Sequence, residues 1–289
     1  MTCALALGAA LGGCSAFSSA NRQQMAEANS VLAPIMKRTS PAEAASWAAD
    51  PYDADKRARG MNLLMNAPWG GEQVYLDLYR QRITDESTPV RAVAARALAL
   101  HGTPADVERI VPLLKEDQPL VRLEATRALQ RLHNPVAVGP LIERLQPDKE
   151  SEPEIRAEAA SALGQYPESR VLQALIAAVA DTSLLVNTEA LSSLRTLTGN
   201  EELGMDRKAW VQWAKETDKP FAHQQPYIYP VFWREKRWID HIPFMPAVPN
   251  EQASTPVGFT MDSAAGTGAA AGAAGGSSVP GPAGAKTGG

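Results

Sequence analysis

Apolar residues return at a helical spacing several times along the middle of the chain. Residues 90–98 follow the pattern Val-Arg-x-x-Ala-x-x-Ala-Leu, which recurs at 121–129 and at 155–163 with Val or Ile in the first place. A copy without the arginine lies at 186–194, and a degraded copy lies at 56–64. Because this spacing gathers the apolar side chains on one side of an α-helix, each copy predicts a helix that buries one face. Alanine is expected where two helices come closest.

A second apolar segment follows each of the first four copies, after a break that contains proline. The predicted second helices cover residues 72–82, 105–115, 136–145 and 170–180. The copies begin 34, 31, 34 and 31 residues apart. A helix, a turn and a second helix at this period predict an all-α solenoid of about five helical hairpins, the HEAT-like type of α-solenoid.

Composition and charge narrow the picture further. About one residue in six is alanine and 6% of residues are aromatic, which favours closely packed helices over an all-β domain. The chain carries 28 basic and 32 acidic residues, a net charge of −4. This balance gives no general attraction to polyanions, so no nucleic-acid partner is expected.

At these positions the repeats resemble the HEAT-like repeats first described in phycocyanobilin lyases, over about residues 55–200. In that family an aspartate in the loop precedes the Val-Arg pair. The corresponding residues here are Asp85, Asp117, Asp148 and Asp181. The resemblance implies that each one caps the coming helix or accepts from the arginine of a neighbouring unit.

The arginines of the pattern form a column of their own. Its members are Arg57, Arg91, Arg122 and Arg156. We interpret this column as a structural ladder between successive units; the alternative is a basic strip that meets a ligand. Three glutamates two positions further on would neutralise such a strip, which favours the structural interpretation: Glu124, Glu158 and Glu189.

The N-terminal sequence predicts how the protein is targeted and how it is held in place. Residues 4–11 form a short apolar segment, and Leu11-Gly12-Gly13-Cys14 resembles the lipobox of bacterial lipoproteins. The resemblance implies that residues 1–13 are a signal peptide and that Cys14 is acylated. An ordinary cleaved signal and a chance apolar start remain the alternatives. Residues 14–39 are then a polar tether.

The same reading places the protein in the bacterial cell envelope, anchored in the membrane by its lipid. Ser15 follows the cysteine, and the sorting rule of well-studied lipoproteins then favours the outer membrane, facing the periplasm. Cleavage before Cys14 removes Cys3, so the mature chain would have no second cysteine for a disulfide or a thiolate metal site.

The expected solenoid covers residues 40–216 and includes a cap at each end. Ser40-Pro41 predicts a capped short helix that packs Trp47 at the N-terminal end. At the C-terminal end, Trp210 and Trp213 lie one turn apart on a predicted helix and are interpreted as closing the stack; the alternative is that they bind a ligand. The surrounding Thr-Gly…Gly-x-Asp…Trp-x-x-Trp pattern resembles the final unit of bacterial HEAT-repeat lipoproteins of unassigned function.

Residues 217–262 combine prolines with aromatic rings and predict an extended strap. The strap packs on the solenoid, docks another protein or rests among membrane headgroups; the first alternative is preferred. The residues that would bind a partner are Trp233, Arg234, Lys236, Arg237 and Trp238. Residues 263–289 are mostly Gly and Ala and predict a disordered tail.

No catalytic, cofactor or metal motif emerges from the sequence. His101 and His133 end first helices and are expected to face helix carbonyls, while His223 and His241 lie in the strap. We therefore expect a non-catalytic scaffold, anchored by lipid, that presents its solenoid to an envelope protein or peptide, with no cofactor and no metal. The alternative, suggested by the repeat resemblance, is a bilin-lyase-like enzyme or chromophore chaperone.

Overall fold

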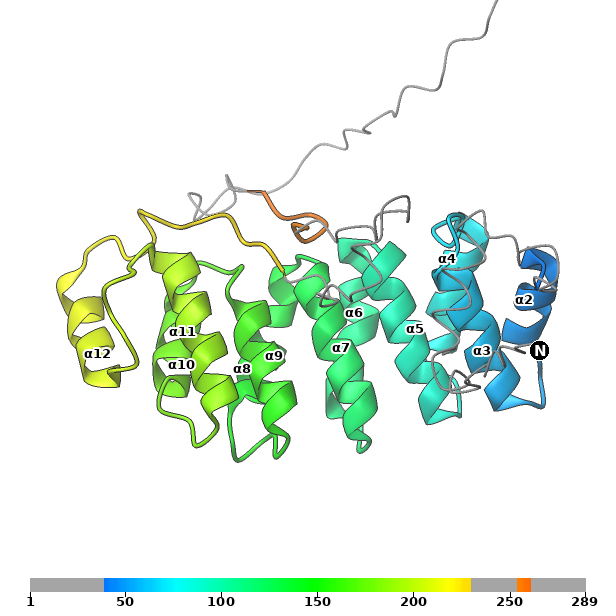
Figure 1. Ribbon diagram of the computed structural model, residues 1–289, viewed down its shortest axis with the longest axis horizontal. Helices are drawn as coiled ribbons and strands as arrows, with labels where there is room; N and C mark the ends of the chain where they lie inside the picture. Colours follow the sequence, from blue (N-terminus) through cyan, green and yellow to red (C-terminus); the bar gives the residue numbers. More distant parts are fainter. Residues whose placement is uncertain (1–38, 230–253, 261–289) are drawn as a thin grey trace, which may run out of the picture.

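The computed structural model describes residues 39–229 and 254–260, and within them the chain is helical (Figure 1). A first helix and a second helix alternate along the sequence, and β-pairing among the described residues is limited to two isolated bridges. The first helices are α3 (Ala54–Met65), α5 (Thr88–His101), α7 (Pro119–Arg131), α9 (Pro153–Leu163) and α11 (Leu184–Thr198). The second helices are α4 (Gln73–Arg82), α6 (Val107–Ile110), α8 (Val138–Leu145), α10 (Ser169–Ala178) and α12 (Arg207–Glu216). The short helix α2 (Pro41–Ala48) precedes them all.

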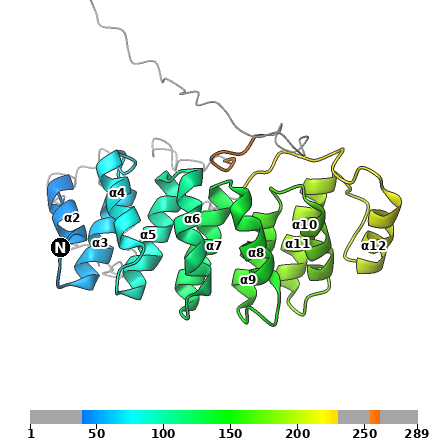
Figure 2. The ribbon, with the colours of Figure 1, turned by 180° about the vertical axis from the view of Figure 1, so that it is seen from behind.

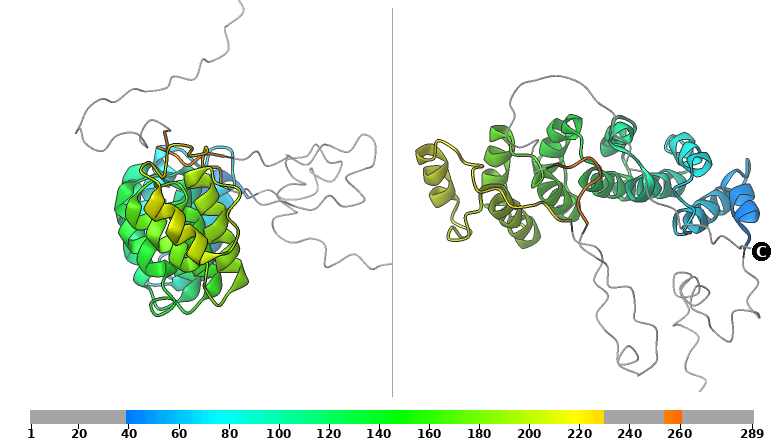
Figure 3. Two further views of the ribbon diagram at one scale, coloured as in Figure 1. Left: turned by 90° about the vertical axis from the view of Figure 1, so that its left-hand side faces the viewer. Right: turned by 90° about the horizontal axis from the view of Figure 1, so that it is seen from above.

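The helices stand side by side in one long row, from α2 at one end to α12 at the other (Figures 1 and 2). Each first helix packs against the first helix of the next unit, and the second helices form a separate layer beside them (Figure 3). This arrangement is the expected α-solenoid of five helical hairpins. Each unit buries its apolar faces only against its neighbours, so the core runs along the whole row.

Alanine brings the first helices into close contact. The third residue after each column position is Ala94, Ala125, Ala159 or Ala190, and none of the four is exposed to solvent. In the first unit this position is Gly60, which faces α2. A Cβ atom there would lie 2.3 Å from the backbone nitrogen of Ala48, so the close contact between α2 and α3 requires glycine.

The second helices of the middle units are shorter than the sequence predicts. The expected helix 105–115 is instead divided into a 3₁₀ turn (Pro104–Asp106), the short α6, and a second 3₁₀ segment (Val111–Lys115). Proline explains the division, since Pro112 cannot donate the hydrogen bond that would continue α6. The third unit has a similar 3₁₀ turn (Pro135–Ala137) before α8.

Both ends of the row are closed by short elements. Ser40 caps α2 by accepting a hydrogen bond from the Glu43 nitrogen (3.1 Å), while Trp47 is half-buried. At the other end, Trp210 of α12 is fully buried and donates from Nε1 to the Gly204 carbonyl (2.9 Å). The Trp213 ring meets it edge-on at 5.7 Å between centroids, so these tryptophans pack at the C-terminal end of the stack.

Candidate functional site

Four arginines, one in each of the first four units, join that unit to the next. Each guanidinium pairs with a carboxylate in the following loop: Arg57 with Asp85 (2.8 Å), Arg91 with Glu116 (2.7 Å), Arg122 with Glu150 (2.7 Å) and Arg156 with Asp181 (2.9 Å). Each arginine also donates to the loop carbonyls before its own helix, as Arg122 does to Glu116 (2.7 Å) and Asp117 (2.8 Å). The structure thus places the arginine column between units, with its hydrogen bonds directed inward.

The accepting carboxylates share one position, six residues before the next column residue. Asp85 and Asp181 occupy it, as the repeat resemblance implies. The expectation was wrong for Asp117 and Asp148, because the accepting side chains in those loops are Glu116 and Glu150. The side chain of Asp148 is 72% exposed, so it faces solvent and not the stack.

Burial and hydrogen bonding act against each other at these carboxylates. Burial by itself would raise the pKa of Glu150. The hydrogen bonds from Arg122 and from the Glu152 nitrogen (3.1 Å) outweigh it and hold this pKa below its usual value. The pKa values of Asp85 and Asp181 are lowered in the same way. These groups remain charged and paired at neutral pH.

A second row of ion pairs runs along the first helices. Arg96 holds Glu124 with two hydrogen bonds (3.0 and 2.6 Å), and Arg127 pairs with Glu158 (2.9 Å). The sequence interpretation that these glutamates neutralise the arginine column was therefore wrong. They pair with arginines five residues after the column, and that register repeats from one unit to the next.

Glu189 stands where this second row ends. The preceding unit has Ser161 at the position that holds an arginine in the two earlier units, so Glu189 makes no ion pair with a described residue. Burial, and then repulsion from Glu158, raise the pKa of Glu189. The second row therefore ends on a carboxylate that is poorly stabilised in its charged form.

The chain after α12 turns back over the ends of the first helices (Figure 1). The Gln225 nitrogen donates to the Thr196 carbonyl of α11 (2.7 Å), and the buried Tyr227 donates from its hydroxyl to the Ser161 carbonyl of α9 (2.8 Å). The guanidinium of Arg131, at the end of α7, lies 5.3 Å from the Tyr229 ring centroid. The described part of the strap thus packs on the solenoid. Its five candidate partner-binding residues, 233–238 without Glu235, lie outside the described residues, as does Cys14.

The described chain resumes at the same place. The Tyr229 nitrogen donates to the Ser254 carbonyl (3.1 Å), so the two ends of segment 230–253 are held together. Val257 then bridges α7, donating to the Arg131 carbonyl (2.8 Å) and accepting from the His133 nitrogen (2.9 Å). Residues 254–260 belong to the predicted strap, and their packing agrees with the preferred alternative. Their contact with α7 was not predicted, although Pro-Val-Gly at residues 256–258 is typical of a turn.

The two repeat histidines serve different contacts. His101 places Nε2 2.7 Å from the Met65 carbonyl at the end of α3, which fits the expectation of a helix carbonyl. His133 departs from that expectation, because its Nδ1 lies 2.9 Å from the Gln165 side-chain oxygen and its ring stacks on Tyr166. Burial lowers the pKa of His133.

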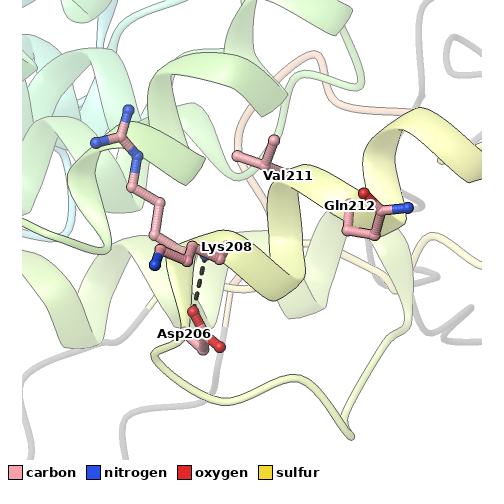
Figure 4. Close-up of a pocket in the computed structure, with 5 residues that line it drawn as sticks. Asp206, Lys208, Val211 and Gln212 are labelled. Carbon is pink, nitrogen blue, oxygen red and sulfur yellow. Dashed lines mark hydrogen bonds between the residues drawn. The ribbon is translucent and has the colours of Figure 1, made fainter.

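Two surface clefts lie elsewhere on the described solenoid. One is an open cleft at the start of α12 (Figure 4), lined by Asp206, Arg207, Lys208, Val211 and Gln212. There Asp206 accepts from the Lys208 nitrogen (2.8 Å) and acts as a helix cap. The other is an apolar cleft between α8 and α10, lined mainly by Ile142, Leu145 and alanines of α10. Neither cleft brings together a nucleophile and a base.

The described part of the chain also lacks a metal-binding cluster and a membrane-spanning helix. Within residues 39–229 and 254–260, no cluster of three or more His, Cys, Asp or Glu side chains could hold a metal ion. None of the helices described is long and apolar enough to cross a membrane.

Comparison with known proteins supports the repeat assignment. Residues 76–151 match the family model of HEAT repeats, and residues 155–181 match the model of the PBS lyase HEAT-like repeat. No curated protein matches the chain. Among solved structures, a designed armadillo repeat protein is similar at 15% identity with a TM-score of 0.46, over 64% of this chain and 95% of the designed one. Residues 76–181 thus contain HEAT-like repeats, which form the middle of the solenoid described above.

Proposed function

We propose that this protein is a non-catalytic scaffold that is anchored in the bacterial envelope by lipid and binds proteins or peptides on its solenoid. The observation that carries the binding role is the continuous stack of five units, whose buried charges are paired with one another. Since the arginine column serves the fold, recognition falls to the exposed side chains of the second helices and the strap. A repeat protein uses such a long surface to bind extended partners.

The anchor rests on the lipobox-like Leu11-Gly12-Gly13-Cys14. Acyl chains on Cys14 would hold the protein at the membrane, because each buried methylene contributes about 0.8 kcal/mol. The variant Cys14→Ser should therefore leave the membrane fraction and persist as an uncleaved precursor. An unmodified Cys14 in the membrane-bound wild type, measured by mass spectrometry, would refute the anchor.

The strap supplies the second proposed binding element. Its sequence between the two pinned ends carries Trp233, Arg234, Lys236, Arg237 and Trp238. Tryptophan and arginine dominate the energetics of protein interfaces, so we assign these residues to partner binding. Their replacement by alanine should weaken partner capture and leave the helical signal unchanged.

The match to the PBS lyase HEAT-like repeat keeps a second candidate, a chromophore-binding protein of the lyase type. That match covers 27 residues (155–181), in which the charged contacts serve repeat packing. Titration with a bilin or heme separates the candidates. The scaffold should leave the pigment absorbance unchanged, whereas a saturable spectral shift at one pigment per chain would favour the second candidate.

Crosslinking in intact cells followed by mass spectrometry tests the scaffold itself. The wild type should yield a small set of envelope proteins that are absent from a Cys14→Ser strain. Recovery of no protein above the background of an unrelated lipoprotein would contradict the proposal.

A further inference from the structure

Backbone hydrogen-bonding groups at the end of α7 are available to a neighbouring chain segment. Leu132, the residue that follows the helix, is in an extended conformation (φ −115°, ψ 107°), so the chain leaves the helix as a short strand edge. On this edge the Arg131 carbonyl and the His133 nitrogen bind Val257, in a parallel bridge opposite Leu132. A helix end that continued as a helix or a left-handed turn would not present these two groups to an added chain.

The segment that occupies this edge is a β-turn. The Phe259 nitrogen donates to the Pro256 carbonyl (3.1 Å), and Gly258 has φ +87°, which is the geometry of a type II turn. A Cβ atom on Gly258 would lie 2.6 Å from Cγ of Pro104 and 3.3 Å from the His133 carbonyl oxygen. Both the backbone angle and the space therefore require glycine at this position.

Some side chains of the turn contact the solenoid, and others face solvent. Pro256 is buried, and the half-buried Phe259 meets the His133 ring edge-on at 5.4 Å between centroids. Phe259 also lies 6.4 Å from the Tyr227 ring. Val257 is 49% exposed, although its backbone makes both hydrogen bonds. The contacts therefore select a sequence Pro-x-Gly-aromatic, with the second position free.

We propose that this surface, formed by Pro104, Leu132, His133 and Tyr227 and here named the α7 notch, is a binding site for Pro-x-Gly-aromatic turns. Residues 256–259 occupy it in the free protein, and a partner protein that carries such a turn displaces them. This inference rests on the proposed scaffold function and names the class of peptide that the scaffold accepts.

A partner turn must compete with the protein's own turn for the notch. The occupying turn is tethered through the 24 residues 230–253, whose ends meet at Tyr229 and Ser254. A turn on the same chain meets the notch at an effective concentration on the order of millimolar. A partner turn of similar intrinsic affinity thus enters the notch only when its protein also binds the solenoid at another place. The notch then adds selectivity to a contact that has formed elsewhere.

The test uses the full chain and a fluorescent peptide with the sequence of residues 252–262. Gly258→Val, and separately Phe259→Ala, should empty the notch while circular dichroism keeps the wild-type helical signal. The peptide should then bind either variant saturably, at one per chain, and bind the wild type at least tenfold more weakly. A peptide carrying the same glycine-to-valine change should bind none of the three proteins. Adding His133→Ala to either variant should remove the binding.

Other outcomes would overturn the proposal. Equal affinity for wild type and variants would place the peptide elsewhere, and absence of binding to both variants would show that the notch has no affinity of its own. A wild-type dimer in sedimentation that Gly258→Val dissolves would mean that the turn is exchanged between copies. If the peptide fails to bind while the crosslinked envelope proteins are still recovered, the notch proposal fails and the scaffold proposal stands.

Discussion

At the residue scale, the position of a charged residue within its repeat determines which residue it pairs with. Each arginine of the column pairs with a carboxylate in the next loop, and each of these carboxylates lies six residues before the next column residue. Both aspartate and glutamate occupy this position. The sequence showed the arginines because their spacing repeats. It did not show which of several neighbouring acids turns inward, because that choice depends on how each loop is folded.

Replacing Glu150 by glutamine should strongly destabilise the fold. The Glu150 side chain is fully buried, and its loss would leave the largely buried Arg122 without its ion-pair partner. Breaking a buried pair in this way costs about 3–5 kcal/mol, whereas a surface change costs within about 0.5 kcal/mol. The matched control is Asp148→Asn, two residues away and exposed. Urea unfolding that ranks the two variants equally would contradict the register assigned to the ladder.

Replacing Glu189 by glutamine should instead stabilise the fold. Its pKa is raised in the fold, so the charged form is disfavoured in the folded state relative to the unfolded state at neutral pH. The neutral amide removes this penalty and should raise the melting temperature at pH 7. Glu158→Gln is the comparison, because it removes the ion pair with Arg127 and should lower the melting temperature. A lower melting temperature for Glu189→Gln would show that an unrecognised cation stabilises this carboxylate.

At the element scale, the sequence predicted the first helices well and the second helices less well. The first helices carry the alanine and leucine positions that pack against two neighbours, so their pattern is strict. The second helices face solvent on one side, and proline at positions 104, 112 and 135 shortens them into 3₁₀ turns. The notch at the end of α7 was not predictable, since it joins α7 to a turn more than 120 residues later in the sequence.

Ala125→Asp should open the stack locally. Ala125 is fully buried at the contact between first helices, where a charge has no partner and no space. Burial of an unpaired charge costs several kcal/mol, so the variant should lose helical signal in circular dichroism and melt earlier. Gln173→Asp on the exposed side of α10 adds the same charge without burial. Similar melting curves for the two variants would mean that the inner face of α7 is wrongly assigned.

At the scale of the whole molecule, stability is a property of contacts between neighbours. Each unit is joined to the next by the helical core and by one rung of the arginine ladder. The ends differ from the middle, with α2 at one side and the tryptophans of α12 at the other. A stack of this kind transmits its shape along its length, and it presents one long surface to a partner.

The ladder predicts an acid limit for the whole stack. The pKa values of Asp85, Glu150 and Asp181 are lowered in the fold, so their stabilising contribution is complete above their unfolded values, near pH 4. It is lost as the pH falls through the lower folded values. His133, whose pKa is also lowered, adds a loss that begins as the pH falls below about 6.5. Thermal melts between pH 3 and pH 8 should show both phases, and His133→Gln should remove only the upper one.

The central claim is that the solenoid surface binds a partner over several units. A photo-crosslinking amino acid placed at one exposed position in each of the second helices α4, α6, α8 and α10 tests it directly, at Gln73, Glu108, Glu143 and Gln173. In the native envelope, at least two successive positions should capture the same protein. Control positions in the loops that join successive units, Asp117 and Asp148, should not capture it. Capture of unrelated proteins at every position, or of none at any position, would contradict the account.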